Sequence, residues 1–276
     1  MADTMKRIRV PDFKERKQRG EPIVVLTAYD FPMAQILDRA GVDILLVGDS
    51  LGMVVLGYQT TLPVTMDAMV HHTAAVSRGA SRALVVADMP FLAGQVSVAE
   101  AVASAGRLIR EGGAAAVKLE GGAPVLDAVR RLVDIGIPVM GHLGLLPQSV
   151  HQVGGYRQQA RQPEEAVRLI DEARLLEEAG AFSIVLESIP AEVARSVTAA
   201  IAIPTIGIGA GPYCDGQVLV TYDMLGLSQG PVPPFVKRYA DLGGSILQAA
   251  TEYAGDVRER RFPAPPGSRS ERTTVS

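Results

Sequence analysis

Two short apolar runs, Ile44-Leu-Leu-Val-Gly at residues 44–48 and Ala83-Leu-Val-Val-Ala at residues 83–87, contain no charged side chain. Continuous runs of this length, without polar alternation, predict strands that are covered on both faces, as in a parallel sheet. Six further runs of similar length begin at residues 23, 115, 137, 183, 203 and 217. The sequence therefore predicts eight buried parallel strands.

Amphipathic segments rich in Ala, Leu, Arg and Glu separate these runs, for example residues 98–111 and 164–179. Several of them end in glycine, which takes the left-handed conformation after a helix without steric cost. Eight strand–helix alternations in 276 residues predict an α/β protein with a (β/α)8 TIM barrel rather than an open doubly wound sheet, although the open sheet stays possible.

The predicted barrel forms a single domain over residues 1–262, with a short helix over residues 10–20. A polar stretch at residues 148–162 interrupts the fifth unit. Residues 263–276 are rich in proline and lack apolar periodicity, so we expect a disordered tail there.

The charge balance, 27 Lys and Arg against 30 Asp and Glu, gives a net charge of −3 and argues against a nucleic-acid partner. Cys214 is the only cysteine, which excludes an internal disulfide and a cysteine-cluster metal site. No apolar run approaches ~18 residues, so we expect no membrane partner. The N-terminus does not resemble a secretory signal, and we expect a cytoplasmic protein.

Acidic residues follow most of the predicted strands, among them Asp49, Asp88, Glu120 and Glu187. The C-terminal ends of barrel strands meet at one mouth, where converging carboxylates need a cation, shared protons or a basic partner. Asp49, Asp88 and Glu120 follow successive strands and would suit Mg²⁺, a hard ion that prefers oxygen ligands. Capping of the following helices is the open alternative for Asp49 and Asp88.

Two more side chains, Lys118 and His142, belong to this predicted mouth, and Glu187 has a distinct place in it. Lys118 lies two residues before Glu120 and shares its face of the strand, where it either forms a structural ion pair or binds a substrate anion. His142 is either a structural histidine or part of the site. Glu187 lies across the mouth from Asp49 and suits a general base, with an ion pair to Arg157 as the alternative.

Read with their neighbours, these residues belong to segments that closely resemble the ketopantoate hydroxymethyltransferase family. The resemblance covers about residues 10–255. The segments that carry it are Thr27-Ala-Tyr-Asp, Val47-Gly-Asp-Ser-Leu-Gly-Met, Thr61-Leu-Pro-Val-Thr, Val117-Lys-Leu-Glu-Gly-Gly, Gly141-His-Leu-Gly-Leu-Leu-Pro-Gln-Ser, Gly154-Gly-Tyr, Leu186-Glu-Ser-Ile-Pro and Ile206-Gly-Ile-Gly-Ala-Gly-Pro-Tyr-Cys-Asp-Gly-Gln-Val-Leu-Val. They occur in the family's order, and together they are highly specific.

The resemblance implies a barrel of the phosphoenolpyruvate/pyruvate superfamily that transfers a hydroxymethyl group from 5,10-methylenetetrahydrofolate to 3-methyl-2-oxobutanoate. The product is 2-dehydropantoate, in pantothenate biosynthesis. The implied roles are Mg²⁺ binding by Asp49, Asp88 and Glu120, substrate binding by Ser50, Asp49, Asp88 and Lys118, proton abstraction by Glu187, and an auxiliary role for His142. It also implies one Mg²⁺ per subunit and a homodecamer.

Two other functions remain open at this point. The first is a Mg²⁺-dependent 2-oxo-acid lyase or phosphonomutase of the same superfamily. Such enzymes often use a cysteine in a mobile loop, whereas Cys214 lies in the turn beyond the seventh predicted strand. The second is a barrel retained only as a binding module, which should have lost acidic residues at the mouth, and no such loss is visible.

Overall fold

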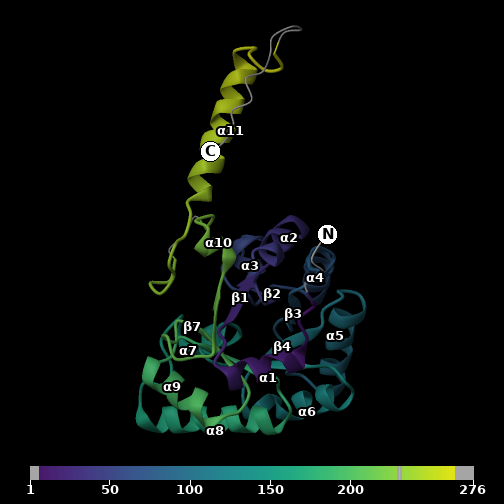
Figure 1. Cartoon of the computed structure of the whole chain (residues 1–276), viewed down its shortest axis with the longest axis vertical. Coiled ribbons are helices and arrows are strands. Elements are labelled where there is room, and N and C mark those ends of the chain that lie inside the picture. Colours follow the sequence, from purple (N-terminus) through teal and green to yellow (C-terminus); the bar gives the residue numbers. More distant parts are fainter. Residues whose placement is uncertain (1–5, 229, 231, 265–276) are drawn as a thin grey trace. The chain divides into compact units, whose positions relative to one another are not determined.

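The computed structural model describes residues 6–228, 230 and 232–264, and its first part is a closed barrel of eight parallel strands in chain order (Figure 1). The strands are β1 (Ile23–Thr27), β2 (Ile44–Val47), β3 (Leu84–Asp88), β4 (Ala116–Glu120), β5 (Val139–Gly144), β6 (Ser183–Glu187), β7 (Thr205–Ile208) and β8 (Gly216–Leu219). Because β8 pairs with β1, the sheet has no free edge. The predicted (β/α)8 fold is confirmed, and the open-sheet alternative is wrong.

Helices follow the first six strands. They are α2 (Phe31–Arg39), α3 (Leu51–Val54), α4 (Met66–Gly79), α5 (Val98–Arg110), α6 (Leu126–Asp134), α7 (Val150–Val153), α8 (Pro163–Glu178) and α9 (Ala191–Ala200), with short 3₁₀ turns η1 (Ala123–Val125) and η2 (Pro147–Ser149). The polar stretch predicted at 148–162 therefore contains one helical turn. Thr65 and Ser97 accept hydrogen bonds from the first turns of α4 and α5, which explains where those helices begin.

The chain divides into two compact units, residues 1–221 and 222–276. All eight strands lie in the first unit; α10 (Thr221–Met224) begins at the boundary, and α11 (Leu242–Arg258) lies in the second. The single domain predicted over residues 1–262 stays a prediction. The tail predicted at 263–276 lies outside the described residues from position 265 onward. In the part of the chain that is described, no helix is long and apolar enough to cross a membrane.

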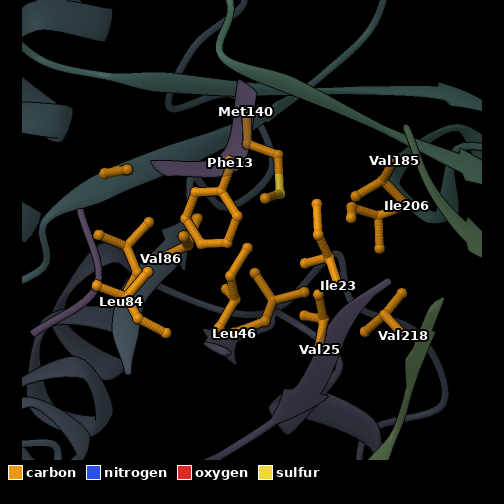
Figure 2. Close-up of a cluster of buried hydrophobic side chains, with 13 residues drawn as sticks. Phe13, Ile23, Val25, Leu46, Leu84, Val86, Met140, Val185, Ile206 and Val218 are labelled. Carbon is orange, nitrogen blue, oxygen red and sulfur yellow. The ribbon is translucent and has the colours of Figure 1, made fainter. Parts of the chain in front are cut away.

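The barrel interior is apolar at the N-terminal ends of the strands (Figure 2). Every strand contributes to this cluster, whose strand members are Ile23, Val25, Ile44, Leu46, Leu84, Val86, Ala116, Met140, Val185, Ile206 and Val218. Phe13, from the predicted N-terminal helix α1 (Val10–Arg19), lies among them and is only 1% exposed. One end of the barrel is therefore a packed core, and α1 contributes to it.

The same inward-facing rows become polar toward the C-terminal ends of the strands. Because side chains alternate faces along a strand, the row of Leu84 and Val86 continues to Asp88. The row of Ala116 likewise continues to Lys118 and Glu120. By the same alternation Met140 is followed by His142, and Val185 by Glu187. The fold thus places a polar layer directly on the apolar core.

Candidate active site

Four carboxylates gather at the polar end of the barrel, and we call them the acid ring: Asp49, Asp88, Glu120 and Glu187. The strand register places two of these carboxylates beside basic side chains: Asp88 pairs with Lys118, and Glu120 pairs with His142. Asp49, Asp88, Lys118, Glu120 and His142 are each at most 4% exposed. The structure therefore unites the residues that the sequence predicted for the site.

Lys118 and His142 connect the two sides of the acid ring. The Lys118 Nζ atom lies 3.2 Å from Oδ1 of Asp88 and 3.0 Å from Nδ1 of His142. On the far side of the ring, His142 Nε2 lies 3.2 Å from Oε2 of Glu187. An ammonium group can only donate, so Nδ1 must accept and the imidazole proton is on Nε2. The contact of Nε2 with Glu187 is close but does not have hydrogen-bond geometry. This contact, and not Arg157, is the partner that the structure gives Glu187.

Asp49 and Asp88 do not cap the helices that follow them, so the capping alternative is wrong. The first residue before α3 is Ser50, whose side chain makes no cap, and α5 is capped by Ser97. Asp88 Oδ2 instead accepts a hydrogen bond of 3.0 Å from the backbone N–H of Asp49. The two candidate metal ligands are therefore joined directly, across neighbouring strands.

Gly48 allows this close approach. A Cβ atom at position 48 would lie 2.7 Å from Oγ of Ser50 and 3.6 Å from Oδ2 of Asp88. Any side chain there would displace Ser50. Ser50 itself is held at 2.9 Å by the phenol oxygen of Tyr29, a buried residue. The predicted substrate-binding serine thus lies beside the acid ring, on the segment that carries Asp49.

Burial dominates the electrostatics of the acid ring. It raises the pKa of Asp88 to about 6 and that of Glu187 to about 7, although Lys118 opposes both shifts. The pKa values of Asp49 and Glu120 are raised for the same reason. Burial would lower the pKa of Lys118, but Asp88, Glu120 and Asp49 outweigh it, so that pKa is raised and the amine stays charged.

Burial and the nearby Lys118 charge hold the pKa of His142 well below its usual range, which keeps this ring neutral. One lysine therefore faces four carboxylates at the mouth. This excess of negative charge suits an additional cation, because each extra ionised carboxylate raises the pKa of its neighbours.

Among the buried oxygen atoms of the acid ring, Oε1 of Glu120 has no hydrogen-bond partner in the structure, and Oδ1 of Asp88 has only its ion pair with Lys118 at 3.2 Å. Buried polar atoms are nearly always satisfied, so such atoms call for a ligand. No group of three or more His, Cys, Asp or Glu side chains is arranged to hold a metal within the described residues. Mg²⁺ needs no such group, because it commonly takes one or two carboxylates and completes its shell with water and substrate oxygens. The donor set therefore fits Mg²⁺.

Two residues at the site were not predicted from the sequence, Tyr29 and Gln148. Gln148, in η2 and 7% exposed, donates from its side chain to Asp49 and from its backbone to Glu120. Both residues lie inside segments that carry the family resemblance, which was the only available signal. Asp30, another acid after a strand, is not part of the acid ring; it caps α2 by accepting from the backbone N–H of Met33.

The comparisons with known proteins agree with this geometry. The family model for ketopantoate hydroxymethyltransferase matches residues 7–265. The chain belongs to this family. A 3-methyl-2-oxobutanoate hydroxymethyltransferase of Thermoanaerobacter sp. (strain X514) is 57% identical over 90% of each chain. One of Moorella thermoacetica is 57% identical over 93% of this chain and 96% of its own. The family is one of enzymes, so the binding-module alternative is not favoured.

Solved structures of low identity show the fold. The barrel of 2,3-dimethylmalate lyase, a member of the PEP mutase/isocitrate lyase superfamily, aligns with a TM-score of 0.58 at 20% identity, over 96% of this chain and 91% of its own. Phosphonopyruvate hydrolase, solved in complex with oxalate and Mg²⁺, aligns with a TM-score of 0.61 at 11% identity, over 91% and 87%. These structures confirm the predicted barrel fold. The hydroxymethyltransferase relatives, at 57% identity, do not favour the lyase alternative.

Proposed function

We propose that this protein transfers a hydroxymethyl group to C3 of 3-methyl-2-oxobutanoate and forms 2-dehydropantoate. The one-carbon unit comes from 5,10-methylenetetrahydrofolate, and a water molecule supplies the hydroxyl oxygen as tetrahydrofolate leaves. The observation that carries the proposal is the charged Lys118 buried among the acid ring, because it offers an anionic substrate a partner beside groups able to accept a proton. The name of the 57% identical relatives supports the choice of substrate.

Lys118 and Ser50 bind the 2-oxo acid. An ammonium group has three N–H donors, and the contacts to Asp88 and His142 account for two of them. The third is available to the substrate carboxylate. Ser50, oriented by Tyr29, offers a hydroxyl group next to Asp49. Asp49 and Asp88 complete this end of the substrate pocket.

Asp49 and Asp88 would hold one Mg²⁺ per subunit, with Glu120 close by, directly or through water. When bound there, Mg²⁺ acts as a Lewis acid that stabilises the negative charge of the substrate's enolate. Without the ion, the single positive charge of Lys118 does not balance the negative charges of the four carboxylates in the acid ring. The Oε1 atom of Glu120, which has no hydrogen-bond partner in the structure, supports this assignment.

Glu187 removes the C3 proton. A general base acts best when its pKa lies near the working pH, and burial raises the pKa of Glu187 to about 7. His142 stays neutral, and its Nε2 atom lies 3.2 Å from Oε2 of Glu187 without forming a hydrogen bond, so it is in contact with the base. The electron pair left by the C3 proton forms the new carbon–carbon bond to the one-carbon unit, and the C2 carbonyl group re-forms. The two bonds from the one-carbon unit to folate nitrogens break, and the oxygen of a water molecule takes the place of the folate.

The folate lies over the open side of the mouth. Tyr156 is half exposed, and partial burial of its side chain raises its pKa; the negative charges of Glu187, Asp49 and Glu120 add to this shift. Its hydroxyl group contacts Sδ of Met53 at 3.5 Å. We assign Tyr156 and Met53 to one wall of the folate site and the turn at residues 209–211, where Gly209 and Gly211 have positive φ, to another.

The family resemblance also supports a homodecamer in the cytoplasm, with small-molecule substrates and neither nucleic-acid nor membrane partners. The near-neutral charge balance is consistent with this set of partners. Native mass spectrometry of the purified chain checks the assembly: ten-subunit particles are expected, and a monomer at working concentration would contradict this part of the proposal.

The test of the proposed function is a product assay. The purified protein, 3-methyl-2-oxobutanoate, 5,10-methylenetetrahydrofolate and Mg²⁺ should yield 2-dehydropantoate, detected by mass spectrometry. Addition of EDTA should stop its formation. If the protein instead cleaves isocitrate-like acids without folate, it is a lyase and the proposal is wrong.

A further inference from the structure

We infer that Gln148 is a positioning residue that fixes the Asp49 and Glu120 carboxylates for metal binding; the inference rests on the proposed function. Gln148 lies in η2, directly after β5, and is buried between the acid ring and the loop that follows β3. Its side chain donates to Asp49, after β2, and its backbone donates to Glu120, at the end of β4.

Both N–H donors of the Gln148 side-chain amide form hydrogen bonds to residues at the acid ring. Its Nε2 atom donates to Oδ2 of Asp49 at 2.9 Å and to the backbone oxygen of Met89 at 3.0 Å. Met89 directly follows Asp88, so this single group ties the β2 end to the β3 end. Asp49 is thereby held through one oxygen in a defined orientation.

The backbone of Gln148 acts on the third carboxylate. Its N–H donates to Oε2 of Glu120 at 3.1 Å, which leaves Oε1 of Glu120 as the buried oxygen without a hydrogen-bond partner. The same residue thus determines which oxygen of Glu120 is used within the protein and which stays available. A side-chain substitution leaves this backbone contact in place and tests only the amide.

The remaining polar atom of Gln148 connects the site to the loop at residues 89–97. Its Oε1 atom accepts a hydrogen bond of 3.0 Å from Nε2 of Gln95, an exposed residue. This contact fixes the amide orientation, because an oxygen must face Gln95 while the nitrogen faces Asp49. All the hydrogen-bonding groups of the amide are therefore specified, and a carboxylate in its place would face Asp49 and the Met89 carbonyl with acceptors only.

Groups that orient metal ligands commonly affect metal affinity by about 10–100-fold. The test is Mn²⁺ binding, measured by electron paramagnetic resonance on the metal-free full-length protein. Gln148→Met keeps the side-chain length and removes the amide, so we expect its Kd for Mn²⁺ to rise about tenfold. Gln148→Glu should weaken binding further, although it adds a negative charge. Gln95→Ala should give a smaller rise, and Gln152→Ala, an exposed glutamine on α7, should give none.

A merely space-filling role predicts that Gln148→Met binds Mn²⁺ like the wild type, and this result would overturn the inference. So would tighter binding by Gln148→Glu, as expected if residue 148 simply adds a ligand. If Gln148→Met does not fold, the Kd of Gln95→Ala for Mn²⁺ tests the inference instead. A Kd in that variant equal to the wild-type value would overturn it. The product assay on the wild type is independent: weakened Mn²⁺ binding without any 2-dehydropantoate formation would remove the proposed reaction and keep the role of Gln148.

Discussion

The substitution Glu187→Gln removes the proposed base with little change in shape, and it should act on both catalysis and stability. The catalytic effect is measured by following exchange of the C3 deuterium of labelled 3-methyl-2-oxobutanoate with solvent, in the presence of Mg²⁺ and without folate. Loss of a positioned general base lowers rates by about 10²–10⁴. We expect the exchange rate of the variant to fall by that factor.

The pH profile gives a second readout of the same reaction. Only ionised Glu187 can accept the proton, and burial raises its pKa to about 7. The wild-type exchange rate should therefore be half-maximal near pH 7 and fall about tenfold for each unit below it. The exchange rate of Glu187→Gln should not show this fall below pH 7. A variant that exchanges as fast as the wild type, with the same pH profile, would remove Glu187 as the base.

The substitution Glu187→Gln should lower the exchange rate but raise the stability of the folded protein at high pH. Because the pKa of Glu187 is raised in the folded state from its usual 4.5 to about 7, folding favours the neutral acid. Its stabilising contribution is full below pH 4.5 and is lost as the pH rises through 7, a change of about 3 kcal/mol. In metal-free protein, the unfolding free energy of the variant relative to the wild type should thus increase by about 3 kcal/mol between pH 4 and pH 8.

Urea unfolding at both pH values measures this difference. The matched control is Glu178→Gln at the exposed end of α8, which should show no comparable dependence on pH. A relative stability of Glu187→Gln that stays constant from pH 4 to pH 8 would mean that Glu187 is not held in a buried, neutralising environment.

Three further substitutions separate the parts of the account. Lys118→Met leaves Asp88 buried without its cation, so it should lower the unfolding free energy, measured in urea at pH 8, by about 3–5 kcal/mol. It should also raise the KM for the 2-oxo acid. Unchanged values of both quantities would contradict the pairing of Lys118 with Asp88. Asp88→Asn should weaken Mn²⁺ binding at least about tenfold with the fold intact by circular dichroism, whereas wild-type affinity would exclude it as a ligand. Phe13→Ala, in the apolar end of the barrel, should cost about 3–5 kcal/mol of stability and leave the turnover of folded protein unchanged; a specific loss of turnover would show that the core and the site are not separate.

The sequence predicted the barrel and most of its site for one physical reason. Both depend on the alternation of side chains along short strands, which is visible without coordinates. Lys118 and Glu120 illustrate this, because their spacing of two placed them on one face and the structure confirms that both are buried inside. The family resemblance added the role of Ser50, which no pattern in the chain supplied, and it agreed with the general-base role that the position of Glu187 had already indicated.

Contacts between loops could not be predicted in this way. Gln148 reaches Asp49, 99 residues earlier in the chain, through a turn whose direction no periodicity determines. Tyr29 reaches Ser50 by the same kind of contact between two strand ends. For Asp49 and Asp88, capping preferences favoured a local role that the structure does not show, because the fold supplies Asp88 with Lys118 and with the Asp49 amide instead.

The most direct test of the central claim is the anomalous scattering of Mn²⁺ in crystals of this protein grown with 3-methyl-2-oxobutanoate. The account predicts one peak per subunit at the acid ring, within about 2.2 Å of carboxylate oxygens of Asp49 and Asp88, with the 2-oxo acid beside it and its carboxylate on Lys118. A peak elsewhere in the barrel, or a bound 2-oxo acid that contacts neither the ion nor Lys118, would contradict it.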